Sequence, residues 1–166
     1  MSQDIEKYRN WIRQAQYTRS TTFYFMSKAL IEQLGKEKGT AEIIKQVEEM
    51  GKASGEARKK MFERNGLDNK FENFSAAAMS ADNMVLFAWE GDSKKVTPEE
   101  RVVEFTYCPI AEGFQKYGAE GIEIGELFCN YIDNAVIQAY NSDYECVHES
   151  SLNIDGLCRL HFKKKQ

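Results

Sequence analysis

The stretch EFTYCPIAEGFQKYG, residues 104–118, decides the expected fold, because a strand-like run ends at Cys108-Pro109 and turns at once into a helix. Proline is favoured at the first helical position, since its missing N–H costs nothing there and its φ angle is already helical. With Pro109 in that position, Cys108 is the N-cap. The stretch therefore predicts a strand over residues 101–107 and a short helix over residues 109–117, ended by the glycine that follows.

A cysteine at a helix N-terminus has a distinctive chemistry. The sulfur of Cys108 is expected beside unpaired backbone N–H groups, and these donors favour a thiolate together with the helix dipole. This predicts a reactive thiol, with a buried cysteine that packs at the strand–helix corner as the alternative. Strand alternation places Glu104 on the same face as Cys108, either as an acid, base or ion-pair partner of the thiol or as a solvent-facing carboxylate.

The composition is that of a globular protein. The 166 residues suit one domain, residues 1–166, and suffice to bury a core without disulfides or metals. Hydrophobic residues make up 42% and charged residues 29%. The net charge of -4 and the pI of about 5.4 argue against a nucleic-acid partner.

Targeting segments and common cofactor motifs are not found in the sequence. No apolar run approaches the roughly 18 residues of a membrane span, and residues 1–9 lack the apolar core of a signal peptide. We therefore expect a cytoplasmic protein with no membrane partner and four reduced cysteines. There is no CxxC pair, nucleotide-binding loop, Gly-x-Ser-x-Gly elbow or His-Glu-x-x-His, so no cofactor and no metal are expected.

The N-terminal 66 residues are expected to form a helical hairpin. Apolar residues recur at helical spacing over residues 5–34, and a glycine follows. A second helix is expected over residues 40–64, with Gly51 and Gly55 loosening its middle. The long first helix is also a candidate for pairing with another copy of the chain.

A polar window at Arg19 and Thr22 interrupts the apolar stripe of the first helix. The window is either a solvated stretch or a surface that faces a ligand. In the second case Arg19 receives an anion, because a guanidinium pairs with a carboxylate through two parallel hydrogen bonds.

Beyond residue 66 the apolar period changes to the alternation of strands. Strands are expected over residues 71–79 and 84–90, followed by a charged loop over 91–95 and a single helical turn over 97–100. The fold class is therefore expected to be α+β. The N-terminal helical hairpin (1–66) packs on an antiparallel sheet of about five strands with two inserted helices (67–166).

The last two of these strands are expected over residues 144–154 and 157–162. The dipeptide Asp155-Gly156 between them is a strong signal for a two-residue turn. Such a turn places Asn153 directly opposite Cys158. It also points Cys158 toward the core.

The second inserted helix, over residues 124–140, carries Cys129 and Asp133 on one face, because they are four residues apart. An aspartate on a mainly apolar face requires a partner if it is buried, and otherwise lies at an edge with access to water. His148 and Cys146 share a face of the following strand. Together these thiols, imidazole and carboxylate suffice for a metal site, but no pair has the close spacing that marks zinc ligands.

The order and spacing of these motifs resemble a known family. They comprise a strand ending in Tyr107-Cys108-Pro109, a helix with Cys129-x3-Asp133, and a final strand that opens with Gly156-Leu157-Cys158. This pattern resembles the L-2-amino-thiazoline-4-carboxylic acid hydrolase family. The resemblance implies a small cytosolic protein that hydrolyses a cyclic amidine-like C–S or C–N bond. It carries over Cys108, Cys129, Asp133 and Cys158 as site residues.

The first hypothesis is therefore a hydrolase that opens a thiazoline-type ring. Cys108 attacks as a thiolate or orients the water that does, and Asp133 acts as general base or holds the amidinium, with Cys129 beside them. The substrate-binding residues of this hypothesis are Arg19, Glu104, Cys158 and Asn153, with Arg19 on the substrate carboxylate.

Two other functions remain open from the residues. The fold also looks like the ligand-binding domains related to 4-vinyl reductase proteins, which implies a non-catalytic module that binds or senses a small molecule. A thiolate-metal protein is the third hypothesis.

Overall fold

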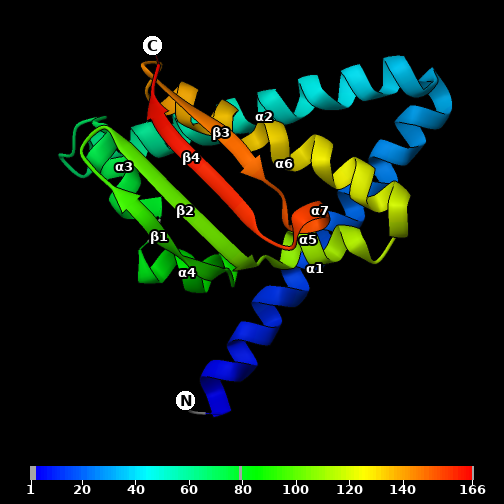
Figure 1. The fold of residues 1–166 in the computed structure, drawn as a ribbon, viewed down its shortest axis with the longest axis horizontal. Helices are drawn as coiled ribbons and strands as arrows, with labels where there is room; N and C mark the ends of the chain where they lie inside the picture. Colours follow the sequence, from blue (N-terminus) through cyan, green and yellow to red (C-terminus); the bar gives the residue numbers. More distant parts are fainter. Residues whose placement is uncertain (1–2, 79, 166) are drawn as a thin grey trace.

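The computed structural model describes residues 3–78 and 80–165 (Figure 1). It contains seven helices and four strands in these residues. Two long helices come first, and short helices and strands alternate after them. The fold class is α+β, as the sequence predicts.

The two long helices are α1 (Gln3–Leu34) and α2 (Lys36–Arg64). They meet at Gly35, whose φ of 80° is left-handed, and they diverge from that turn (Figure 1). Helix α2 begins four residues before the expected residue 40, because its first turn directly follows Gly35. The N-terminal part of α1 projects away from the rest of the molecule (Figure 1).

Two helices occupy most of residues 71–90, where the sequence predicted two strands. Helix α3 (Phe71–Ala78) and helix α4 (Ala81–Phe87) occupy this segment, and the predicted strand residue Met79 lies outside the described part of the chain. The helical spacing of Phe71 and Phe74 buries both rings, with 2% and 3% of their surface exposed. An alternating strand would have turned some of this apolar surface to solvent.

The prediction of a loop over residues 91–95 and a helical turn over residues 97–100 was also wrong. The charged segment expected as a loop is strand β1 (Glu90–Val96), paired antiparallel with β2 (Glu100–Tyr107). The helical turn expected over residues 97–100 is instead the turn between these strands, in which the Thr97 N–H donates to the Glu100 carbonyl at 2.8 Å. Glu100 is already the first residue of β2, so the segment has no room for a helical turn.

The sheet has four strands rather than five, in the order β1-β2-β4-β3, all antiparallel (Figure 1). Strands β3 (Tyr144–Ser150) and β4 (Cys158–Lys164) end the chain. Two inserted helices, α5 (Pro109–Gln115) and α6 (Gly118–Tyr140), lie between β2 and β3, as predicted. Both outer strands, β1 and β3, contain register irregularities.

The expected tight turn between the last two strands is not formed. Strand β3 stops at Ser150, and a four-residue helix, α7 (Leu152–Asp155), follows it. The Ser151 hydroxyl accepts the Asn153 N–H, and the Asp155 carboxylate accepts the Ser151 N–H at 2.8 Å. These reciprocal bonds cap the helix. Asn153 therefore lies in α7 rather than opposite Cys158, whose partner across the sheet is Phe105.

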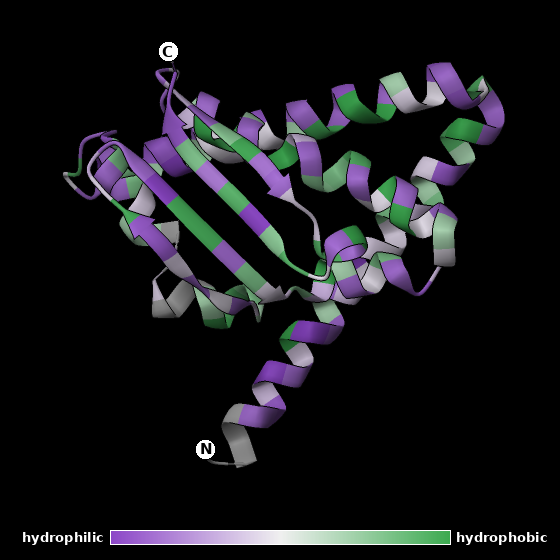
Figure 2. Ribbon diagram, viewed as in Figure 1, coloured by the Kyte–Doolittle hydropathy of each residue, from purple (hydrophilic) through white to green (hydrophobic). Residues whose placement is uncertain are grey.

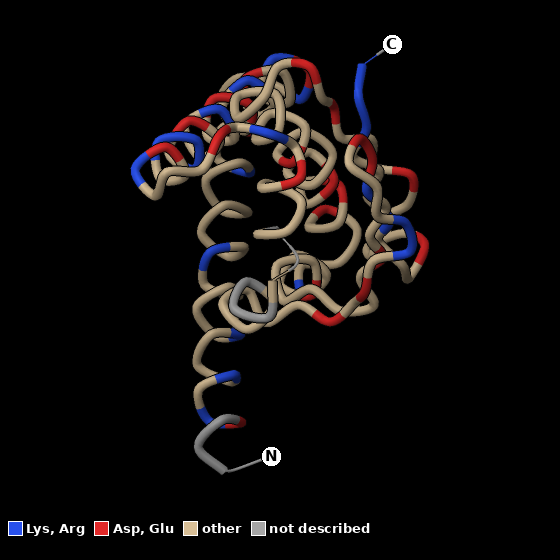
Figure 3. Tube along the Cα trace, turned by 90° about the vertical axis from the view of Figure 1, so that its left-hand side faces the viewer, with Lys and Arg blue, Asp and Glu red and all other residues tan. Residues whose placement is uncertain are grey.

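All the long helices lie on one side of the sheet (Figures 1 and 3). Two apolar cores fill that side. Along β4, hydrophobic residues alternate with hydrophilic ones, and β2 carries residues of both kinds (Figure 2). The first core joins the inner face of the sheet to α3 and α6 and includes Phe71, Phe74, Val103, Phe105, Ile137, Tyr140, Leu160 and Phe162. The second joins α1, α2, α5 and α6 and includes Tyr24, Ile43, Val47, Ile110, Phe114, Ile124 and Phe128.

Helices α2 and α6 are in direct backbone contact. A Cβ on Gly51 would meet the Ile132 carbonyl oxygen at 2.8 Å, and one on Gly55 would meet the Val136 carbonyl oxygen at 2.3 Å. The two glycines therefore permit the close crossing of α2 over α6, and do not merely loosen α2 as the sequence suggested.

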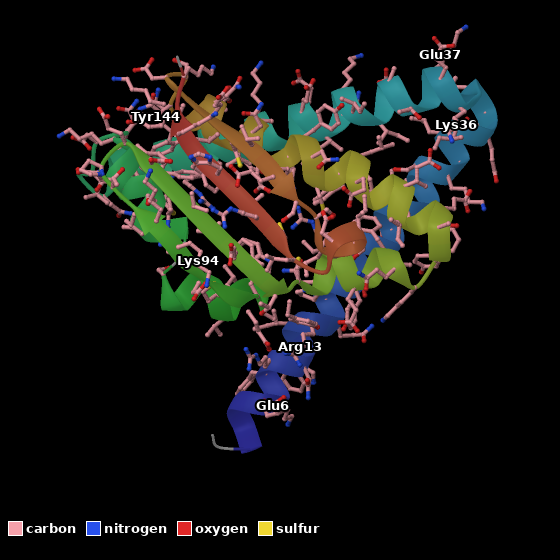
Figure 4. All side chains as sticks on the ribbon, viewed as in Figure 1. Glu6, Arg13, Lys36, Glu37, Lys94 and Tyr144 are labelled. Atoms are coloured by element: carbon pink, nitrogen blue, oxygen red, sulfur yellow. The ribbon has the colours of Figure 1, made fainter. Side chains whose placement is uncertain are left out.

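Within the described residues, no helix is both long enough and apolar enough to span a membrane. The N-terminal part of α1 is tied to the sheet by charge. Arg13, labelled in Figure 4, donates to the Glu90 carboxylate at the start of β1 at 2.9 Å.

The outer face of the sheet carries a network of charged side chains. His161 faces two carboxylates, Glu100 at 2.6 Å from Nε2 and Glu149 at 2.9 Å from Nδ1. Lys95 also pairs with Glu100 and, with His161, holds the pKa of that carboxyl below its ordinary value of 4.5. Burial opposes ionisation of Glu149, but hydrogen bonds from His161 and Arg159 outweigh it and lower the pKa of that carboxyl too.

This network predicts a loss of stability in acid. A carboxyl whose pKa is lower in the folded than in the unfolded state stabilises the fold above its unfolded pKa, and the contribution is lost as the pH falls through the folded pKa. We expect Tm to fall as the pH drops below about 4.5, and Glu100→Gln to flatten that fall. Thermal melts across acidic pH measure this. Glu49→Gln, on the exposed surface of α2, is the matched control, and an equal flattening by that variant would contradict the prediction.

Candidate functional site

All four cysteines gather around Asp133 where the two apolar cores meet. Cys108 caps α5, Cys129 comes from α6, and Cys146 and Cys158 come from β3 and β4. Cys146 and Cys158 contact the first core, whereas Cys108 and Cys129 contact the second. Burial raises the pKa of every thiol, and the Asp133 carboxylate adds to each rise through its charge. We call these five residues the cysteine cluster.

Cys108 takes the position that its sequence predicts but not the ionisation. It is the N-cap of α5, with an extended backbone and Pro109 in the first turn. Burial raises the pKa of the Cys108 thiol, and the nearby N–H groups of Ala111, Ile110 and the Trp89 indole offset this rise only in part. Burial thus acts against the thiolate that the helix N-terminus favours, and it favours the alternative of a packed, neutral thiol.

Asp133 has a partner that the sequence analysis did not assign to it. The Nε2 atom of His148 lies 3.3 Å from an Asp133 carboxylate oxygen. Only 9% of the His148 side chain is exposed, against 37% for Asp133, so the pair reaches from the interior to solvent. A carboxylate accepts and does not donate, so the neutral imidazole carries its proton on Nε2. The remaining nitrogen, Nδ1, is buried and has no hydrogen-bond partner among the residues that the structure describes.

His148 lies on the same sheet face as two of the cysteines. Cys146 is two residues before it on β3, and Cys158 is diagonal to it, because His148 pairs with Leu160 on β4. From the sequence, the only role suggested for His148 was that of a metal ligand. Its alternation with the buried Cys146 was the signal that it points inward.

Asn153 reaches the cluster from α7 through Glu126 of α6. Its amide nitrogen donates to Glu126 at 2.9 Å, and the Ser151 hydroxyl donates to the same carboxylate oxygen. The charge of Glu126 acts on Cys129 and Cys158, which places it beside the cluster. The Asn153 Oδ1 atom is buried without a partner. Glu126 was missed, although its three- and seven-residue spacing from Cys129 and Asp133 puts all three on one helix face.

Glu104 does not join the cluster. It lies on the outer face of the sheet, where Arg159 donates to it and Lys94 lies 3.5 Å away. The prediction that it shares a site with Cys108 was wrong, because the chain leaves the strand before Cys108 and strand alternation no longer applies to that side chain. Its ion pair with Arg159 is not one of the roles expected from the sequence.

Arg19 lies apart from the cluster. It lines a groove of about 430 Å³ between α1, α2, α5 and α6, into which none of the four cysteines projects. Its guanidinium lies 5.6 Å from the centre of the Phe128 ring.

Residues 3–78 and 80–165 contain no group of three or more His, Cys, Asp or Glu side chains arranged to hold a metal ion.

The chain matches a family model over residues 14–155, and that model is described as L-2-amino-thiazoline-4-carboxylic acid hydrolase. The chain belongs to this family. The matched region includes Cys108, Cys129, Asp133, His148 and Asn153, and it ends before Cys158. No curated protein matches the chain.

A solved structure has a fold similar to that of this family member. The protein is similar in fold to a trafficking protein particle complex subunit 3 from Naegleria fowleri, in a crystal structure where that subunit is covalently bound to palmitic acid. The identity is 11%, the TM-score is 0.61, and the match covers 92% of this chain and 96% of the other. At that identity the likeness concerns the fold alone.

Proposed function

We propose that this protein hydrolyses the ring of a small cyclic amidine of the L-2-amino-thiazoline-4-carboxylate type. The observation that carries the proposal is the Asp133–His148 pair, whose free Nδ1 lone pair lies buried beside the cysteine cluster. A lone pair without a donor in the interior costs stability unless a ligand or water completes it. The family match supports the substrate class.

The polar groups around the cluster suit a cationic amidine. Asp133 and Glu126 supply carboxylates, and Asn153 presents a buried oxygen that accepts no hydrogen bond. An amidinium carries several N–H donors in one plane, and charge-assisted hydrogen bonds to carboxylates are the strong ones. The site therefore offers acceptors where this substrate offers donors.

His148 is the general base of the proposed reaction. Its Nδ1 takes a proton from a water molecule, and the water oxygen forms a bond to the amidine carbon. Asp133 holds the imidazole through Nε2 and stabilises the charge that it gains. The C–S bond of the ring then breaks, the added hydroxyl gives its proton to solvent, and the amidine carbon becomes the carbonyl carbon of a urea.

Cys108 is the proposed acid. Because its pKa is raised, it holds a proton at neutral pH and can pass it to the leaving ring sulfur. The N–H groups of Ile110, Ala111 and Trp89 then stabilise the thiolate left on Cys108, and the proton on His148 restores the resting state through solvent. The net reaction adds one water. Cys129 and Cys158 remain neutral thiols that line the substrate.

Incubation with L-2-amino-thiazoline-4-carboxylate tests this function. We expect release of one free thiol per substrate, measured with a chromogenic disulfide, and a product whose mass has gained one water. The matched oxazoline, with oxygen in place of the ring sulfur, is expected to release no thiol. A product without added water, or no turnover above the uncatalysed rate, would reject the proposed reaction.

A further inference from the structure

We propose that the groove beside Arg19 is a second binding site, for an aryl carboxylate, separate from the cysteine cluster and independent of the proposed hydrolysis. The groove is bounded by α1, α2, α5 and α6 and has a volume of about 430 Å³, within the range of small-molecule sites. It is lined by Ala15, Thr18, Arg19, Ser20, Thr22, Phe23, Met26, Met50, Ile110, Phe114 and Phe128.

Three phenylalanine rings from different helices lie along the groove, but Phe114 is 0% and Phe128 6% exposed, so the partly exposed Phe23 is the ring that a ligand can reach. Phe23 meets Phe128 edge-on at 5.1 Å and Phe114 edge-on at 6.0 Å, and Phe114 tilts against Phe128 at 6.0 Å. Aromatic rings prefer such edge-to-face or offset contacts, so this lining favours a flat aromatic body. Met50 and Met26 are adaptable side chains that can close on a ligand of irregular shape.

Arg19 is the single charged residue among those that line the groove. Among the described residues it has no ion-pair partner; its side chain is exposed, and its guanidinium lies over the Phe128 ring. A guanidinium left without a carboxylate beside an apolar surface selects an anion, and its planar fork matches a carboxylate through two parallel hydrogen bonds. Charge and lining together specify a ligand with an aromatic body and one carboxylate.

The neighbouring polar side chains do not compete for Arg19. The hydroxyls of Thr18 and Thr22 donate to carbonyls of their own helix at 3.0 and 2.9 Å. Ser20 does the same and is 1% exposed, packed where α1 approaches Gly113 of α5. The polar window of the first helix thus leaves one group, the Arg19 guanidinium, available to a ligand.

Calorimetric titration with naphthalene-2-carboxylate tests the site, with naphthalene-2-carboxamide as the neutral match. We expect saturable binding of the carboxylate, and binding of the amide weaker by about tenfold or more, because a charge-assisted pair is lost. Arg19→Gln should weaken carboxylate binding by a similar factor. Arg64→Gln, which removes an equal charge from an exposed position at the end of α2, should leave it unchanged.

Three results would overturn the proposal. The first is equal binding of acid and amide, or no binding of either. The second is unchanged affinity in Arg19→Gln. The third is sedimentation showing that a second copy of the chain occupies the groove and excludes the probe. His148→Asn separates the two sites, since it should leave naphthalene-2-carboxylate binding intact. Loss of binding in that variant would place the probe in the cysteine cluster and refute a separate site.

Discussion

Replacing His148 by asparagine is expected to slow thiazoline ring opening by about 10²- to 10⁴-fold, the range lost with a general base. Asparagine keeps a polar side chain of similar reach but has no nitrogen that can take a proton from water. Initial rates of thiol release measure the effect. The matched control is His161→Asn, because His161 is the other histidine of the chain and lies on the outer face of the sheet. Equal loss in both variants would show a general effect of histidine removal.

Asp133→Asn tests the orientation of the imidazole. The amide retains shape and hydrogen bonding, so we expect little change in Tm, but it no longer fixes the Nε2–H tautomer of His148. Turnover should fall by about 100-fold or more. A stable variant with undiminished activity would remove Asp133 from the mechanism. A large fall in Tm without ligand would instead assign it a structural role, in which its charge partner is Arg58.

Replacing Gly55 by alanine is expected to reduce the free energy of unfolding by about 1–3 kcal/mol, the usual cost of overpacking. The added Cβ would lie 2.3 Å from the Val136 carbonyl oxygen and 2.8 Å from the Ala139 Cβ, and neither atom can rotate away. Helices α2 and α6 must therefore separate. The gain in helix propensity, about 1 kcal/mol, offsets only part of the cost.

Thermal and urea unfolding measure this change, with each kcal/mol lowering Tm by about 2–4 °C in a chain of this size. Ser54→Ala is the matched control, since Ser54 is exposed on the same turn and changes propensity without meeting α6. If helix propensity alone governed the site, Gly55→Ala would be at least as stable as the parent, and that result would contradict close backbone packing.

The predicted elements that the structure confirms have strong local signals. The long helices end at glycines with left-handed φ, and Pro109 sets both the end of β2 and the start of α5. Residues 71–90 lacked such signals, because short apolar runs fit either a strand or a helix. Their helical form depends on distant rings, since Phe71 stacks on Tyr144 at 4.4 Å and Phe74 lies 5.1 Å from Tyr140.

In the candidate site, too, local features could be predicted from the sequence and features that depend on distant residues could not. The spacing of Cys129 and Asp133 predicted a shared helix face, and the Cys-Pro junction predicted the N-cap, because both are local properties. The burial of Cys108, which raises the pKa of its thiol against the N–H groups at the helix end, is a property of the whole fold and could not be predicted from the Cys-Pro junction. The His148–Asp133 contact joins residues of β3 and α6, and sequence spacing does not reveal such a pair.

The irregular outer strands of the sheet determine how copies of this chain can meet. Strand β1 combines two register irregularities with the exposed charges Asp92, Lys94 and Lys95, and β3 has an irregularity near His148. An interrupted ladder with lysines along it is a poor template for another strand. Growth of the sheet from one molecule into the next is therefore disfavoured, which protects the folded protein from cross-β aggregation. Any stable self-association has to use a helical surface, where exposed aromatic side chains such as Trp11 of α1 are found.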